Sequence, residues 1–196
     1  MNIDRIHHVA YRCRDAKETV QWYVDNLNME FMLAIAEDQV PSTKEPDPYM
    51  HVFLDAGAGN VLAFFELPTK AEMGRDENTP AWVQHIAFKV KDRKTLMEYK
   101  ARLENNGINV LGVVDHAIFH SIYFFDPNGH RLELACPDEN EAPKLKMLDD
   151  VKWAMLDEWS KTKRAPKHAA WMHEKEFDIN QAKSSHDSNH DGELDQ

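Results

Sequence analysis

At 196 residues the chain is long enough to bury one substantial hydrophobic core, and its formal net charge of −11 argues against a protein that follows nucleic-acid phosphates. Only two cysteines occur, Cys13 and Cys136, which argues against a disulfide scaffold or a thiolate zinc site and favours a reducing compartment. The N-terminus lacks the apolar segment of a signal peptide, and no apolar run is long enough to span a membrane. We therefore expect a cytoplasmic protein with no nucleic-acid or membrane partner.

Two stretches of the chain, residues 7–27 and 84–104, resemble each other and indicate an internal duplication. Aligned at a shift of 77 positions, they share polar residues at matching places, His8 with His85 and Asp15 with Asp92. Each stretch begins as an alternating strand, reaches an aspartate suited to cap a helix, and continues with apolar residues at helical spacing. The sequence therefore predicts the same strand and helix twice.

Turn signals divide the remainder of each copy into further strands. Each copy predicts about three strands after its helix; in the first copy two of them lie at 50–57 and 60–68, and the copy also carries a long loop at 36–49. The second copy predicts three strands, at 108–115, 120–126 and 130–135. Near the end of each copy a glutamate stands between two apolar residues, and on this pattern Glu66 aligns with Glu133 at a shift of 67 positions.

The residues after 137 differ in character from the two copies. Residues 144–160 carry apolar side chains every three or four positions, which predicts an amphipathic helix. Such a helix packs either on its own domain or on a partner chain, and the second arrangement would form a homodimer. We predict a second short helix over 168–177 and a disordered, polar tail over 179–196. The expected organisation is a domain, a helical extension and a tail, with bounds 1–137 (modules 3–68 and 81–137), 138–178 and 179–196.

Two histidines at duplicated positions indicate a metal site. Residues of one parity share a face of a strand, so His8 and His85 each lie among apolar neighbours and Glu133 lies on an inward face. Burying a carboxylate without compensation is costly, and a divalent cation is a common remedy. We predict these three residues as ligands of one divalent metal, with iron(II), nickel, zinc, manganese or cobalt suited to the donors. The alternative is a buried salt-bridge network that uses Arg12 or Arg131.

The paired stretches, the His-x-Ala strand starts, WYVDNLNM at 22–29 and YFFDPNGHRLEL at 123–134 together resemble the vicinal oxygen chelate superfamily. That superfamily includes glyoxalase I, the fosfomycin and bleomycin resistance proteins and the extradiol ring-cleaving dioxygenases. The resemblance covers about residues 3–137 and implies an α+β fold, with paired βαβββ modules forming a cupped mixed sheet around one divalent metal. The chain departs from the family at Asn28, a turn position where a glycine is usual.

The resemblance implies an enzyme, with two chemistries open. Extradiol dioxygenases use two histidines and one carboxylate, which His8, His85 and Glu133 would supply, and the open positions take a catechol-like substrate with adjacent oxygens and dioxygen. Tyr123 matches the active-site tyrosine of these enzymes, ten residues before the glutamate, and His116 loosely matches their acid/base histidine. We place this iron(II)-dependent oxidoreductase first.

Glyoxalase I resembles the same triad but adds a second glutamate, here Glu66, as ligand and proton carrier in lyase or isomerase chemistry on a glutathione adduct. Arg12 stands where glyoxalase I has an arginine that helps to hold the glutathione carboxylate. Glu66 could also lie in the surroundings of the metal without binding it. A third class, a non-catalytic protein that binds a small drug molecule, commonly lacks the metal ligands. His51 is expected either to pack in the core or to line the cavity.

Overall fold

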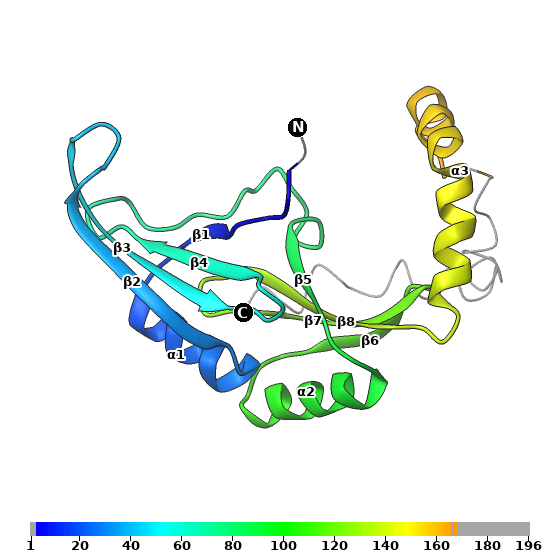
Figure 1. The fold of residues 1–196 in the computed structure, drawn as a ribbon, viewed down its shortest axis with the longest axis horizontal. Coiled ribbons are helices and arrows are strands. Elements are labelled where there is room, and N and C mark those ends of the chain that lie inside the picture. Colours follow the sequence, from blue (N-terminus) through cyan, green and yellow to red (C-terminus); the bar gives the residue numbers. More distant parts are fainter. Residues whose placement is uncertain (1–2, 166, 168–196) are drawn as a thin grey trace. The chain divides into compact units, whose positions relative to one another are not determined.

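The computed structural model of the chain describes residues 3–165 and residue 167 (Figure 1). Contacts within the chain divide these residues into two compact units. The first unit runs to Phe88 and also includes Met97–Val110 and Tyr123–Glu133. The second unit contains Lys89–Leu96, Leu111–Ile122 and the described residues from Leu134 onward.

The first copy forms a four-stranded sheet with one helix. Its elements follow the chain as β1 (Val9–Cys13), α1 (Ala16–Leu27), β2 (Glu30–Gln39), β3 (Pro46–Asp55) and β4 (Val61–Glu66). The strand order is β1-β4-β3-β2, with β1 parallel to β4 and the other neighbours antiparallel. Parallel neighbours require a crossover connection, which the chain makes through α1, β2 and β3. The first copy is therefore a βαβββ module.

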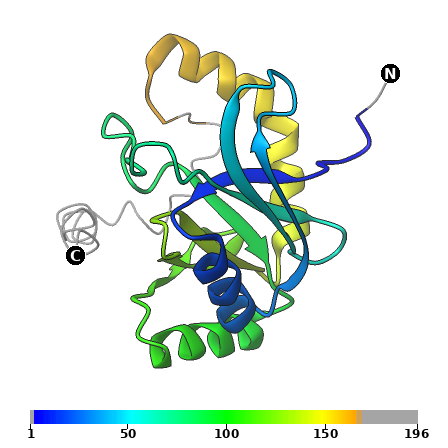
Figure 2. The ribbon, with the colours of Figure 1, turned by 90° about the vertical axis from the view of Figure 1, so that its left-hand side faces the viewer.

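Helix α1 lies along one face of this sheet (Figures 1 and 2). It begins at the predicted cap, because the Asp15 side chain accepts a hydrogen bond from the backbone N–H of Glu18 at 2.8 Å. It ends at Asn28, whose φ of 56° is left-handed, a conformation that asparagine tolerates better than most residues. Its Tyr23 and Leu27 are buried with apolar strand residues, Val52, Leu54, Leu62 and Phe64. The helix thus covers the hydrophobic face of the sheet.

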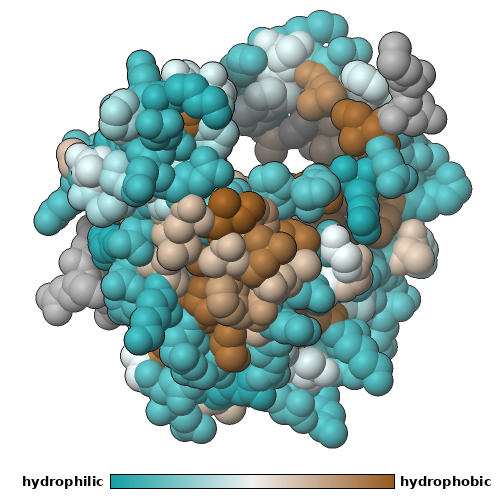
Figure 3. Space-filling model, turned by 60° about the vertical axis from the view of Figure 1, so that its left-hand side comes forward, coloured by the Kyte–Doolittle hydropathy of each residue, from teal (hydrophilic) through white to brown (hydrophobic). Residues whose placement is uncertain are grey.

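Strand β2 occupies residues that the sequence partly assigned to a loop over 36–49. In the structure β2 runs to Gln39 and pairs with β3, which begins at Pro46, so that only the turn between them is loop. Clean alternation is absent here because Phe31, Met32 and Leu33 are consecutive apolar residues, and the ladder contains two register shifts. All ten residues of β2 are exposed. The space-filling view of the side that carries β2 (Figure 3) shows a broad apolar patch near its centre.

The second copy repeats the module. Its elements are β5 (His85–Lys89), α2 (Arg93–Asn105), β6 (Leu111–Asp115), β7 (Phe119–Phe125) and β8 (Arg131–Pro137), and the strand order is β5-β8-β7-β6. Asp92 caps α2 as predicted, since its carboxylate accepts a hydrogen bond from the backbone N–H of Thr95 at 2.8 Å. The α+β fold of paired βαβββ modules is confirmed, with a four-stranded sheet in each module.

Helix α3 (Glu141–Thr162) follows the second module and extends slightly beyond the predicted 144–160 at both ends. Its first turn is tied to the preceding strand end, because the Lys144 amine contacts the Asp138 carboxylate at 2.7 Å. The helix predicted over 168–177 and the tail predicted over 179–196 lie outside the described residues. Within the described part of the chain, no helix combines the length and the apolar character needed to cross a bilayer.

Candidate metal site

The centre of the candidate site is a contact between two of the predicted ligands. Glu133 on β8 is only 3% exposed, and its Oε2 lies 2.9 Å from Nε2 of His85 on the neighbouring strand β5. The other ring nitrogen of His85, Nδ1, is 3.0 Å from the carbonyl oxygen of Val83. A carbonyl oxygen can only accept, so Nδ1 carries a proton and the Nε2 atom faces the carboxylate. A lone pair on Nε2 would repel the carboxylate oxygen at this distance, so the contact requires either a second proton or a cation between the two atoms.

Two further side chains border this pair. The ring of Tyr123, a largely buried residue, stands edge-on to the His85 ring with centroids 6.1 Å apart. The Arg131 guanidinium lies over the Tyr123 ring, 4.5 Å from its centroid. Burial lowers the pKa of the Arg131 guanidinium, while Tyr123 and Glu133 act in the opposite direction. The tyrosine ring therefore lies near both an imidazole and a cation.

The predicted salt-bridge alternative finds little support in the contacts of the two arginines. The guanidinium of Arg12 donates to the carbonyl oxygen of Ala71 at 2.5 Å rather than to a carboxylate. The Nε atom of Arg131 is buried and has no hydrogen-bond partner among the described residues. The ion pair that Glu133 makes at 2.9 Å is with His85. An imidazole is thus in ion-pair contact with the buried carboxylate.

The third predicted ligand, His8, has different neighbouring side chains. Its ring is 5.8 Å from that of Phe53 and 6.1 Å from that of His51, and its Nδ1 is 2.9 Å from Nδ1 of His7. His51 stacks on Phe65 with centroids 3.6 Å apart, and burial together with the nearby His8 lowers the pKa of His51. Among residues 3–165 and 167, no three His, Cys, Asp or Glu side chains are grouped closely enough to hold a metal. The structure thus brings His85 and Glu133 together and leaves His8 beside aromatic rings of its own module.

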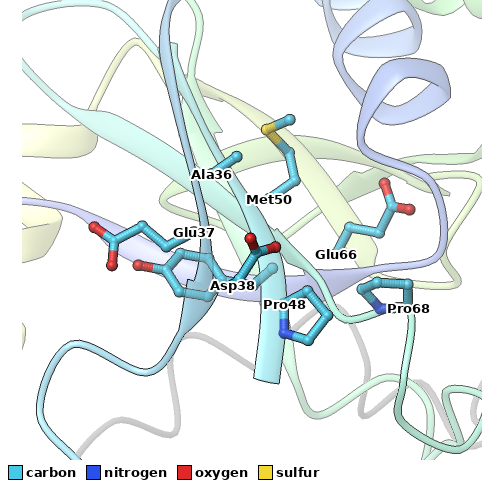
Figure 4. A pocket seen from close by; sticks show the side chains of 8 residues that line it. Ala36, Glu37, Asp38, Pro48, Met50, Glu66 and Pro68 are labelled. Carbon is cyan, nitrogen blue, oxygen red and sulfur yellow. The ribbon is translucent and has the colours of Figure 1, made fainter. Parts of the chain in front are cut away.

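Glu66 has a contact of its own at the start of α1. Its Oε2 accepts a hydrogen bond from the backbone N–H of Ala16, the first residue of the helix, at 2.7 Å. In the sheet Cys13 pairs with Glu66 whereas Val9 pairs with Leu62, so Glu66 is at the opposite end of these strands from His8. Glu66 also lines an acidic pocket of about 250 Å³ with residues of β2 and β3 (Figure 4), Ala36, Glu37, Asp38, Pro48, Tyr49 and Met50, and with Pro68. The structure therefore places Glu66 at the far end of its sheet from His8.

The reason is a difference in register between the two copies. The turn before β4 closes with a hydrogen bond from Ala56 N to Asn60 O, and the turn before β8 with one from Asp126 N to His130 O, a shift of 70 positions rather than 67. The exposure pattern agrees, because one half-buried residue and then three buried residues begin both strands. On this register the counterpart of Glu133 is Ala63, which is fully buried. A shift of three is odd, so Glu66 faces the other side of the sheet.

His116, the predicted acid/base residue, belongs to the second compact unit. Its backbone N–H donates to the carbonyl oxygen of Phe119 at 2.9 Å, and its ring lies 4.9 Å from the Phe119 ring. The tight turn between them includes Ala117 in a left-handed conformation, with φ of 66°. Its catalytic role stays a prediction.

Comparison with known proteins identifies the family. The model of the Glyoxalase/Bleomycin resistance protein/Dioxygenase superfamily matches residues 5–134. The chain belongs to this superfamily. A curated relative from Bacillus subtilis (strain 168), named "Putative ring-cleaving dioxygenase MhqA", is 29% identical over 84 residues, which is 43% of this chain and 27% of the relative. The chain thus matches about a quarter of the length of that relative.

Solved structures of this superfamily share the fold. A glyoxylase/bleomycin resistance protein/dioxygenase domain from Frankia sp. EAN1pec is 19% identical, with a TM-score of 0.55 over 70% of this chain and 95% of its own. A glyoxalase family protein from Enterococcus faecalis is 27% identical, with a TM-score of 0.52 over 69% of this chain and 99% of its own. The fosfomycin resistance protein FosX from Listeria monocytogenes, seen in one structure with Mn(II) and 1S,2S-dihydroxypropylphosphonic acid, is 19% identical there, with a TM-score of 0.51 over 71% of this chain and 98% of its own.

Proposed function

We propose that the chain is a metal-dependent enzyme of this superfamily that cleaves the ring of a catechol-like substrate, with His8, His85 and Glu133 as metal ligands. The observation that carries the proposal is the contact between His85 Nε2 and the buried Glu133 carboxylate. The Val83 carbonyl fixes the proton on the far nitrogen of His85, which is how ligating histidines are commonly held. The donors suit a divalent cation, and the related FosX fold accommodates Mn(II).

The single carboxylate favours ring cleavage over glyoxalase-like chemistry. A second glutamate from the first module would have to stand at the counterpart of Glu133, and that position is Ala63. The residue considered for that role, Glu66, instead binds the first backbone N–H of α1. Two histidines and one carboxylate leave room for a chelating substrate and for dioxygen. The curated relative named as a ring-cleaving dioxygenase agrees with this choice.

Each residue of the site has a defined task in this proposal. Bound iron(II) would supply the electron transfer that lets dioxygen react with a catechol. Tyr123 would donate a hydrogen bond from its phenol to the oxygen on which negative charge develops. Arg131 would hold the Tyr123 ring in place through its contact with the ring face. His116 would transfer protons, as expected from its place in the sequence.

The test is anaerobic reconstitution of the protein with iron(II), followed by oxygen uptake on a panel of catechols. We expect uptake and a yellow ring-fission product, both lost in Glu133→Gln and retained in Glu139→Gln, a matched change at an exposed residue after β8. Nickel- or zinc-dependent consumption of a glutathione hemithioacetal without oxygen uptake would show the lyase or isomerase instead. Tight binding of a small molecule with no metal dependence would show a binding protein.

A further inference from the structure

Helix α3 presents an apolar arc to solvent. Its 22 residues include none that is buried, and five large apolar side chains are exposed, Leu145 (45%), Met147 (49%), Trp153 (72%), Leu156 (59%) and Trp159 (47%). At 100° per residue all of these except Met147 project within an arc of about 120°. Two tryptophans and two leucines exposed on one side of a helix mark a surface that another element covers.

The spacing along this arc matches the seam of two packed helices. Steps of four and three residues connect Leu145, Asp149, Lys152, Leu156 and Trp159, the spacing of core positions in a coiled coil. The two polar residues of this set, Asp149 and Lys152, are paired with each other on the same helix. Polar residues in such a seam lower stability but restrict register and oligomeric state. The occupant that this spacing fits is another α-helix.

Charge selects a second copy of the same helix. An antiparallel copy that places Leu145 of each helix opposite Trp159 of the other also places Glu141 opposite Lys163 and Lys146 opposite Glu158. The helix dipoles also oppose favourably in this orientation. A parallel copy in register would place each of these charges opposite an identical one.

The same charges argue against a membrane surface as the occupant. Within Glu141–Thr162 four lysines are outnumbered by five acidic residues, so the helix has a net charge of −1. The whole chain carries −11. Helices that lie on anionic lipid surfaces carry an excess of lysine and arginine on their polar face, which α3 lacks.

The base of α3 is joined firmly to its own unit. Lys144 contacts both the Asp138 carboxylate and the Ala117 carbonyl oxygen, and Glu141 lies 3.7 Å from the Lys89 amine. We propose that α3 pairs antiparallel with α3 of a second copy, and that Leu145, Leu156 and Trp159 are covered in the resulting homodimer. This interface is independent of the metal site and of the proposed reaction.

Sedimentation equilibrium of the full chain tests the pairing. We expect a dimer that Leu156→Glu weakens at least tenfold, whereas Met147→Glu leaves the affinity unchanged, because Met147 is 49% exposed on the opposite side of the same helix. Far-UV circular dichroism of each variant shows that α3 still forms. A monomeric natural chain, or equal effects of the two substitutions, overturns the proposal. So does binding to phosphatidylserine vesicles through the same arc.

Disulfide crosslinking tests the orientation. In an antiparallel pair, Leu145→Cys mixed with Trp159→Cys gives a crosslinked heterodimer, while neither variant crosslinks strongly with itself. Self-crosslinking of Leu145→Cys in preference to the mixed product would establish a parallel pair and contradict the proposal. The native Cys13 and Cys136 are buried and do not interfere with this reading.

Discussion

Replacing Glu66 separates a structural role from a metal-binding role. Glu66→Ala removes the acceptor of the Ala16 N–H, and Ala16 is buried at the start of α1, so this donor loses its partner. Leaving such a group unsatisfied and removing a negative charge from a helix N-terminus together cost about 2 kcal/mol. Glu66→Gln keeps an oxygen acceptor and loses only the charge, which costs about 0.5 kcal/mol.

Urea denaturation and metal analysis measure the two roles side by side. With a denaturant slope of about 2 kcal/mol per molar, Glu66→Ala lowers the unfolding midpoint by about 1 M and Glu66→Gln by about 0.25 M. The matched control is Glu18→Gln, which changes an exposed acid in the first turn of the same helix and leaves the Ala16 contact intact. Both Glu66 variants keep the natural metal stoichiometry by elemental analysis. Loss of the metal in Glu66→Gln, with the midpoint unchanged, would refute the role at the helix.

Three further outcomes are expected. Tyr23→Phe removes the hydrogen bond that the buried Tyr23 hydroxyl donates to Asp126 at 3.1 Å. We expect the free energy of unfolding to fall by about 1 kcal/mol in denaturant titrations. An unchanged unfolding midpoint would contradict this expectation. Burial raises the pKa of the Cys13 thiol to about 11; the thiol of the unfolded chain ionises first as pH rises, so the stability contributed by the neutral thiol is present below about pH 9 and is lost toward pH 11. Calorimetry across this range should show a smaller decline in Cys13→Ala, and equal declines would be inconsistent with that cause. A mixture of His8→Ala and Glu133→Ala chains recovers up to about a quarter of the iron-dependent activity, because two copies can combine the intact halves of the site. No recovery means that each site closes within one chain.

The duplication allowed much of the fold to be predicted from sequence. Asp15 and Asp92 were expected to cap equivalent helices, and both accept the hydrogen bond that defines such a cap. These signals are local, since they depend on a few neighbouring residues. Strand β2 was partly missed because its pairing with β3 depends on residues far along the chain, and its own pattern lacks alternation.

The site shows the same division between local and distant information. Glu133 was predicted on an inward face, and the structure buries it against His85. The alignment of Glu66 with Glu133 followed a short match of apolar residues around each glutamate, whereas the turns before the two strands set a different register. Those turns have different sequences, AGAGN and DPNGH, so their equivalence is visible only in their hydrogen bonds. The sequence could not identify Ala63 as the counterpart of Glu133, because an alanine side chain has no group typical of a metal site.

The irregular ladder of β2 has a consequence for the behaviour of the chain at high concentration. As the outer strand of its sheet, β2 offers unpaired backbone groups along one side, beside exposed Phe31, Leu33 and Ile35. A straight strand of this composition would be a template for fibril growth. The register shifts between Phe31 and Leu33 and between Glu37 and Gln39 interrupt that template, so an incoming strand can match it only over a few residues at a time.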